Sequence, residues 1–108
     1  MSLDELDPVL TPPKRLAALG VLDVSRRVEF SFLRDHLGLS DSDLSKQLKA
    51  LTDAGYAESR RTGRGRSRTT WFSVTDKGSA ALATHAAALR SLVTPPAPPA
   101  ADAITPVP

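Results

Sequence analysis

The chain has 108 residues, which is enough for one domain with a modest core and too few for two. It contains no cysteine, so a disulfide framework, a thiolate zinc site and a cysteine redox switch are excluded. The net charge is only +2, but residues 1–10 carry three acids and no base, whereas residues 59–68 carry five arginines and no acid. This uneven distribution favours docking in one orientation on an anionic partner.

The sequence lacks the signals that are typical of several classes of protein. The acidic N-terminus lacks the basic start and apolar core of a signal peptide, and no stretch approaches the roughly 20 apolar residues of a membrane span. We therefore expect a soluble, cytoplasmic protein with no membrane contact. No nucleophile–base pair, phosphate-binding loop, nucleotide fingerprint or metal cluster is visible, so we expect no enzyme and no cofactor. His36 is expected to be a packed helix residue, and His85 has no second ligand nearby, so no metal site is predicted.

The first helix is predicted after an N-terminal arm at residues 1–10. Thr11 is followed by two prolines, and a hydroxyl at the N-cap with proline in the first turn favours a helix over about 12–23. Leu16, Leu19 and Leu22 recur there at helical spacing. The alternation of residues 28–30 then predicts a brief strand.

A short helix and a longer one are predicted next, separated by a glycine. The short helix is expected to begin at a cap on Ser31 and to end at Gly38. Its buried side is expected to comprise Phe32, Leu33, His36 and Leu37. The longer helix spans about residues 40–54, because Ser40 and Asp43 have the spacing of a capping box and Gly55 is well placed as a left-handed stop.

The longer helix has two chemically different sides. Leu44, Leu48 and Leu51 fall on one narrow arc, which must face the core. The other side offers hydroxyl and ammonium groups that can donate to phosphates or base edges. In a helix-turn-helix the second helix enters the major groove, and its predicted DNA contacts here are Ser42, Ser45, Lys46 and Lys49, with Gln47 to one side.

A basic hairpin is predicted directly after this helix. Residues 56–61 and 68–74 have the composition of strands, and two glycines lie in the turn between them. Arg64 and Arg66 are expected at the tip, aimed at the minor groove, whereas the arms hold phosphates through Arg60, Arg61 and Arg68. Helix, turn, helix and hairpin together predict a winged helix-turn-helix, a mainly α fold of the α+β class with a small β-hairpin wing. This fold and charge pattern predict a sequence-specific, double-stranded DNA-binding transcriptional regulator.

The last helix is predicted from Thr75 to about Leu92, which completes a domain at residues 11–93. An apolar stripe with small neighbours favours close packing against a second copy, with the first helix taking part. The predicted dimer contacts are Leu16, Leu19, Leu82, Ala86, Leu89 and Val93. Residues 94–108 hold six prolines and are expected to form a disordered tail.

Residues 33–56 also resemble the recognition unit of the MarR/ArsR-type winged-helix regulators. Residues 44–48 and 51–56 match its serine-basic dipeptide, leucine spine and glycine-aromatic helix end, and residues 74–78 match its turn from wing to last helix. The resemblance covers about residues 12–92 and is closest to compact single-domain members. It implies a homodimeric repressor or activator on a pseudo-palindromic operator. It also implies a small-molecule effector site between dimer helices and DNA-binding lobe, which Trp71 or Tyr56 could line.

Other interpretations of the same residues stay open at this level. The serine and lysine side of the third helix could be an ordinary solvated surface, and the apolar stripe of the last helix could pack on its own domain. Trp71 and Tyr56 could belong to the core at the base of the wing. The whole module could also bind protein, with its basic wing on an acidic partner.

Overall fold

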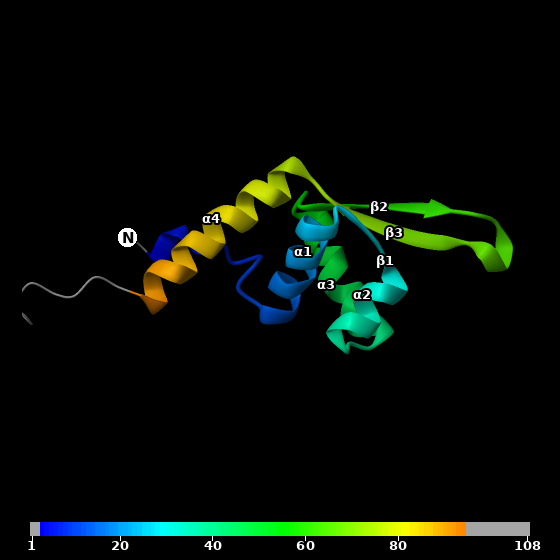
Figure 1. Ribbon diagram of the computed structural model, residues 1–108, viewed down its shortest axis with the longest axis horizontal. Helices are drawn as coiled ribbons and strands as arrows, with labels where there is room; N and C mark the ends of the chain where they lie inside the picture. Colours follow the sequence, from blue (N-terminus) through cyan, green and yellow to red (C-terminus); the bar gives the residue numbers. More distant parts are fainter. Residues whose placement is uncertain (1–2, 95–108) are drawn as a thin grey trace, which may run out of the picture.

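The computed structural model describes residues 3–94 and has the predicted winged helix-turn-helix architecture (Figure 1). Helices α1, α2 and α3 gather on one side of a three-stranded sheet, the β2–β3 hairpin extends away from them, and α4 leads off in the opposite direction. In chain order the elements are η1 (Leu3–Glu5), α1 (Pro13–Ser25), β1 (Arg27–Glu29), α2 (Phe30–Leu37), α3 (Asp41–Asp53), β2 (Ala57–Thr62), η2 (Gly65–Ser67), β3 (Thr69–Val74) and α4 (Asp76–Val93).

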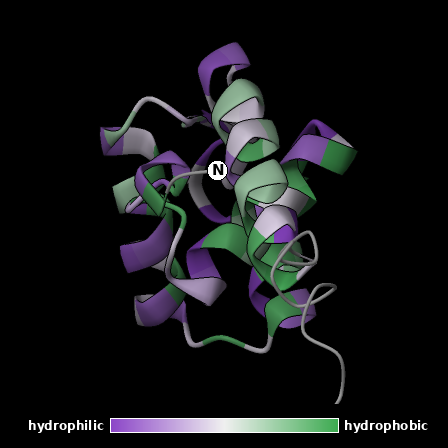
Figure 2. Cartoon of the chain, turned by 90° about the vertical axis from the view of Figure 1, so that its left-hand side faces the viewer, coloured by the Kyte–Doolittle hydropathy of each residue, from purple (hydrophilic) through white to green (hydrophobic). Residues whose placement is uncertain are grey.

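The core lies where the first three helices meet the sheet. Leucines from every one of these helices are completely buried, as Leu22, Leu33 and Leu51 illustrate. Each such side chain contributes about 1.5–3 kcal/mol by leaving water, so this cluster supplies most of the stability of the domain. Along the helices, hydrophobic and hydrophilic stretches alternate (Figure 2), as expected of elements that bury one side only.

The sheet is antiparallel with strand order β1-β3-β2. Val28 of β1 lies opposite Phe72 of β3, and both face the core. Side chains alternate along a strand, so Trp71 and its cross-strand neighbour Arg60 project from the other face. The strand predicted at residues 28–30 is confirmed one position earlier, since Phe30 already begins α2.

The strongest local signals at helix ends are confirmed. The Ser40 side chain accepts a hydrogen bond from the Asp43 backbone N–H at 3.1 Å, and Thr75 does the same for Gly78 at 2.9 Å. Gly38 ends α2 in the left-handed region with φ +66°, where glycine carries no steric penalty. Gly38 and Ser40 thus fix where α2 ends and α3 begins, and Thr75 fixes the start of α4.

Two predicted caps are wrong. The N-cap of α1 is Pro12, which has no side chain able to cap, while the Thr11 hydroxyl donates to the Asp7 carbonyl at 2.9 Å. The N-cap of α2 is Glu29, and Ser31 donates instead to the Glu29 carboxylate at 3.2 Å. In both places the hydroxyl expected to cap the helix donates to an oxygen atom close by in the sequence, and another residue occupies the N-cap position.

The predicted buried side of α2 is also only partly correct. Leu33 is buried, but Phe32 is 53% exposed and His36 is exposed, with the two rings stacked 5.6 Å apart between centroids. The short helix spans only two turns, so it reaches the core along a narrower strip than its apolar composition predicts. An apolar surface is left on the outside of α2.

Residues 3–10, the described part of the predicted N-terminal arm, pack against the domain. Leu10 is completely buried in the core cluster, and Val9 packs against it. The predicted tail lies outside the described residues, apart from Thr94. In the described part of the chain, no helix has both the length and the apolar character needed to cross a membrane.

Candidate nucleic-acid interface

Helix α3 presents a polar side to solvent opposite its leucine side. Ser42, Ser45, Lys46 and Lys49 are all exposed, whereas Leu44 and its partners one and two turns along are buried. Ser40 caps the helix, and its hydroxyl lies within hydrogen-bond distance of the Ser42 hydroxyl, at 3.3 Å. The structure therefore brings four of the five predicted contacts of α3 onto one accessible surface.

The acids near this surface are already paired with cations. Asp43 accepts a hydrogen bond from Lys14 of α1 at 2.6 Å, and Asp41 accepts one from Arg34 of α2 at 3.0 Å. The hydrogen bond from Lys14 holds the pKa of Asp43 below its ordinary value, helped by a second bond from Gln47. These pairs offset the repulsion that a phosphate backbone would otherwise meet at the start of α3.

The two lysines of α3 differ in their neighbours. Lys49 pairs with Asp53 one turn along at 3.0 Å, but both side chains are mostly exposed. Such a pair is worth only about 0.3–0.5 kcal/mol and can be exchanged for a phosphate at little cost. Lys46 has no carboxylate within ion-pair distance among residues 3–94, so its ammonium group is the more available of the two.

Gln47 is a correction to the predicted contact set. Its side chain is only 7% exposed, and both ends of its amide are used inside the protein. The oxygen accepts from Arg15 of α1 at 3.1 Å and the nitrogen donates to Asp43 at 3.0 Å, while a second nitrogen of Arg15 donates to the Val9 carbonyl at 3.2 Å. Gln47 therefore anchors α3 to α1 instead of facing DNA.

Sequence reasoning missed this anchoring role of Lys14 and Arg15. The two residues are basic and follow the prolines of α1, which gave no indication that they face α3. Their partners lie about thirty positions further along the chain. Only the packing angle between α1 and α3 brings them together, and no periodic pattern in a single sequence encodes that angle.

The wing is a regular hairpin closed by a short 3-10 turn. The six residue pairs of β2 and β3 run from Ala57 opposite Val74 to Thr62 opposite Thr69. Gly63 has φ +81°, and a Cβ there would lie 2.3 Å from the carbonyl oxygen of Ser67. Only glycine fits at this point, because the backbone on the other side of the turn occupies the space of a side chain.

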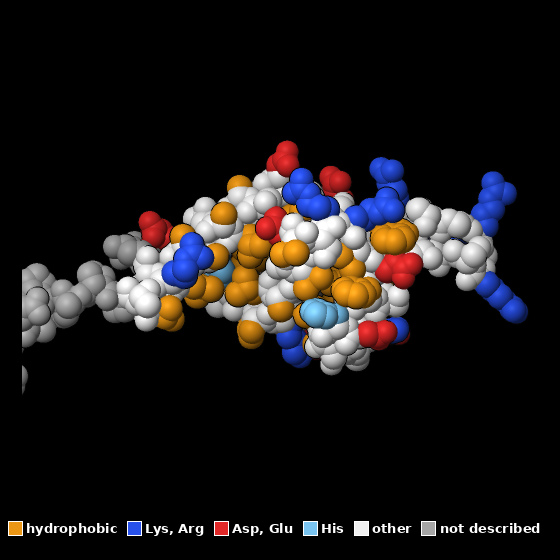
Figure 3. Space-filling view, in the orientation of Figure 1, with side chains coloured by type: hydrophobic (Ala, Val, Ile, Leu, Met, Phe, Trp, Pro, Cys, Tyr) orange, Lys and Arg blue, Asp and Glu red, His pale blue; other side chains and the backbone are white. Residues whose placement is uncertain are grey.

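All five wing arginines are exposed and free of ion pairs with any described residue. Arg60 and Arg61 project from opposite faces of the hairpin, since they are neighbours in β2. Arg64 and Arg66 lie in the turn itself. Figure 3 shows basic side chains (blue) at the far end of the hairpin, well away from the acidic ones. Unpaired guanidinium groups of this kind suit phosphate oxygens, which they can bind two at a time.

Trp71 and Tyr56 occupy different places. Trp71 lies on the outer face of the sheet, donates from its indole nitrogen to the Thr62 hydroxyl at 3.2 Å, and has the Arg27 guanidinium 4.5 Å from its ring centroid. Tyr56 is partly buried at the start of the hairpin and packs against the core cluster. Of the two places that the sequence leaves open for these residues, an effector site or the core, the core is where Tyr56 packs.

Tyr56 joins a polar cluster that holds residues 3–10 in place. Its hydroxyl donates to the Asp7 carboxylate at 2.5 Å, and this bond raises the pKa of Tyr56 to about 12. The Asp7 backbone N–H donates to Nδ1 of His85 in α4 at 2.9 Å. His85 is almost completely buried, and its Nε2 has no partner within the described residues. One aspartate thus ties the N-terminal segment to both the wing base and α4.

The predicted dimer residues divide into three groups. Leu19 is completely buried in its own core, so its predicted role at a dimer surface is wrong. Leu16 and Leu82 are half-buried and pack against the same core. The remaining three positions lie toward the far end of α4; Ala86 and Leu89 are half-buried, and Val93 is 75% exposed.

Comparison with known proteins agrees with this geometry. A family model described as a winged helix DNA-binding domain matches residues 14–93. No curated protein matches the chain. The chain belongs to this winged-helix DNA-binding family, and its architecture is that of the MarR/ArsR-type transcriptional regulators, as the sequence resemblance predicts.

Solved structures with the same fold include regulators from several organisms. A transcriptional regulator homologue from Pyrococcus horikoshii OT3 is 22% identical with a TM-score of 0.74, over 79% of this chain and 84% of that one. A "possible transcriptional regulator for arsenical resistance" is 28% identical with a TM-score of 0.60, over 86% and 88%. The PcaV transcriptional regulator of Streptomyces coelicolor, solved with its natural ligand, is 18% identical with a TM-score of 0.64, over 93% and 72%.

Proposed function

We propose that the chain is a sequence-specific regulator of transcription that binds duplex DNA as a homodimer. In each protomer α3 enters the major groove and the tip of the wing reaches the minor groove, while the arms of the wing hold the backbone. The observation that carries this proposal is that the solvent-facing polar side of α3 is followed along the chain by a wing whose exposed arginines pair with no described acid. Acids close to α3 are paired with neighbouring cations, and the cations left without an ion pair among the described residues of α3 and the wing are Lys46 and the wing arginines.

The contacts divide by chemistry into those that specify sequence and those that supply affinity. Ser42, Ser45 and Lys46 are near the start of α3, where hydroxyl and ammonium groups can reach base edges. Lys49 follows one turn later and suits the backbone. The wing contacts supply charge and shape recognition; they are Arg60, Arg61, Arg64, Arg66 and Arg68.

Selection of bound duplexes from a random pool tests the sequence-specific part. We expect an inverted repeat with half-sites about one DNA turn apart, because a two-fold dimer presents two copies of α3 with that spacing. Lys46→Ala should alter the selected sequence, whereas the matched change Lys49→Ala should mainly weaken binding. A pool that gains no common sequence would contradict the proposal. Capture of an acidic protein without salt-sensitive duplex binding would favour a protein-docking module instead.

The dimer is proposed to form through the far half of α4. Val93 is 75% exposed, Ala86 and Leu89 are half-buried, and Leu16 and Leu82 are the other half-buried apolar residues assigned to this surface. Sedimentation equilibrium tests this: Val93→Asp should shift the chain toward the monomer. The matched change Val24→Asp, at an 84% exposed position on α1, should leave association unchanged. Equal effects of the two variants, or a monomeric native chain, would contradict this dimer.

A further inference from the structure

Helix α3 is held to the domain by apolar packing along its length and by a polar network near its start. The apolar contacts come from three leucines that are almost completely buried, Leu44, Leu48 and Leu51. Apolar packing has no preferred direction, so the leucines hold α3 to the core without closely fixing its rotation. Hydrogen bonds require defined distances and angles, so the polar network can fix what the leucines leave free.

The centre of the polar network is Gln47, which is buried on the core side of α3. Its amide oxygen accepts from Nε of Arg15 at 3.1 Å, and its amide nitrogen donates to Asp43 at 3.0 Å. Asp43 also accepts from Lys14 at 2.6 Å. Two consecutive residues of α1 thus hold two residues that lie one turn apart in α3. We call these four residues the α1–α3 clamp.

The guanidinium of Arg15 has a second partner outside α3. Its Nη1 donates to the Val9 carbonyl at 3.2 Å, and Val9 precedes the completely buried Leu10. The donors of a guanidinium lie in one rigid plane, so the two bonds of Arg15 fix its direction as well as its position. The clamp therefore holds α3 against a support that is itself anchored in the core.

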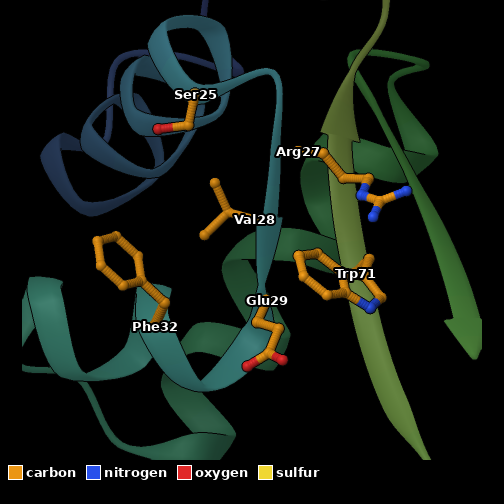
Figure 4. Close-up of a pocket in the computed structure, with 6 residues that line it drawn as sticks. All are labelled: Ser25, Arg27, Val28, Glu29, Phe32 and Trp71. Atoms are coloured by element: carbon orange, nitrogen blue, oxygen red, sulfur yellow. The ribbon is translucent and has the colours of Figure 1, made fainter.

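The other end of α1 is joined to the sheet. Figure 4 shows α1 ending near Ser25 and the chain continuing as β1, from which Val28 points toward the helices. Val28 is buried and lies opposite Phe72 of β3, the strand that forms one arm of the wing. Helix α1 therefore connects the wing at one end to α3 at the other, so the clamp also bears on the angle between α3 and the wing.

We propose that Arg15, acting through Gln47, sets the rotation of α3 and thereby selects the DNA sequence that α3 recognises. This inference rests on the proposed function and deepens it: Arg15 is a positioning residue that does not itself touch DNA. The residues proposed to reach base edges alternate along α3 with the clamp residues, so they turn together. Side-chain tips lie about 5–6 Å from a helix axis, so a rotation of roughly 20° moves them by about 2 Å, which is enough to break a hydrogen bond to a base.

Residual dipolar couplings of the full chain without DNA measure the orientation of α3 relative to α1, independently of the proposed function. The double variant Arg15→Met/Gln47→Met replaces both hydrogen-bonding partners by apolar groups of similar length, so its thermal unfolding should stay close to native. The single variant Arg15→Met is measured beside it. In both variants we expect the couplings of α3 to lose the common fit that they share with α1 in the native chain. An unchanged common fit in both variants would overturn the proposal.

DNA binding tests the consequence for sequence selectivity. The affinities to compare are those for the duplex selected from the random pool and for a scrambled duplex of equal length, at several salt concentrations. The double variant should lower the ratio of these affinities about tenfold, which is the loss expected for one misplaced base contact. Its affinity for the scrambled duplex and its salt slope should stay native, because no phosphate contact is removed. Arg90→Met, which removes the same charge from α4, is the control and should leave the ratio unchanged.

The possible failures can be told apart. A flatter salt slope would show that Arg15 binds phosphate directly, and an equal loss of affinity for both duplexes would show that the substitutions only weaken the fold; either result overturns the proposal. A selective native chain whose variants stay equally selective would refute this inference alone. A native chain without selectivity would refute the proposed function and this inference together.

Discussion

Removing the two arginines at the tip of the wing gives the sharpest test of the DNA-binding interface. Arg64 and Arg66 are exposed, and no acid within the described residues pairs with them, so Arg64→Ala/Arg66→Ala should change the free energy of unfolding by less than about 0.5 kcal/mol. If both reach into the minor groove and each neutralises one phosphate charge there, each contact contributes about 1 kcal/mol at moderate salt. Affinity per protomer should then fall roughly thirtyfold, which corresponds to about 2 kcal/mol.

The dependence on salt separates a lost phosphate contact from a distorted fold. Each phosphate contact adds about −0.9 to the slope of log K against log salt concentration, so the double variant should flatten the slope by about 1.8 for each protomer bound. Fluorescence anisotropy of a labelled duplex at several salt concentrations measures this slope. Arg90→Ala, which removes the same charge from the last turn of α4, is the matched control and should leave the slope unchanged.

Two results would refute the reasoning about the wing. An unchanged slope with unchanged affinity would show that the tip does not touch DNA. A loss of affinity that is equal at all salt concentrations, together with a lower melting temperature, would show that the substitutions act through the fold. Either result would leave the separate prediction for α3 to be judged from its own variants.

Three further predictions concern local chemistry. Gly63→Ala should destabilise the wing by more than 1 kcal/mol and weaken DNA binding, because the added Cβ would lie 2.3 Å from a backbone oxygen. Gly65 also has a positive φ, +56°, but open space around it, so Gly65→Ala should destabilise the wing less. Thermal unfolding of both variants measures the difference. Tyr56 is the only tyrosine, and its pKa, measured by ultraviolet absorbance, should be near 12 and return toward about 10 in Asp7→Asn. Because folding raises this pKa, the bond of Tyr56 to Asp7 stabilises the fold below about pH 10, and this stabilisation is lost as pH rises through 12. The pKa of Asp43 is lowered by its bonds to Lys14 and Gln47, so these bonds stabilise the fold above about pH 4, and this stabilisation is lost as pH falls through the folded-state pKa. Acid unfolding measures this loss, which Asp43→Asn should remove.

Features set by neighbouring residues along the chain were predictable from the sequence. Ser40 caps α3 and Gly38 ends α2 because each acts within a few residues of itself, so their effect does not depend on the rest of the fold. The hairpin was predictable for the same reason, since its strand formers and turn glycines are adjacent. The exposed cationic side of α3 followed from the leucine side, which fixes the orientation of the helix.

Features set by the packing of distant segments were not predictable. Gln47 has the composition of a surface residue, and only the approach of α1 buries it against Arg15. Leu19 is buried for the same reason, although its spacing alone would equally suit a surface stripe. His85 contacts a residue 78 positions away, so nothing near it in the sequence indicated the bond. In each case the missing information is an angle between two helices or the path of a terminal segment.

The hydrogen bonds of Asp7 show that the folding unit begins before the first helix of the winged helix-turn-helix. A shortened chain that starts at residue 11 would keep every helix and strand of the winged helix-turn-helix. It would, however, leave the Tyr56 hydroxyl without its carboxylate partner and the His85 ring without its amide partner. It would also remove the completely buried Leu10 and leave a cavity in the core. Losing one buried leucine alone costs about 2–5 kcal/mol, which is a large share of the stability of a domain of this size. Residues 7–10 are therefore an integral part of the globule, and trimming them would threaten refolding before it affected any surface proposed to touch DNA.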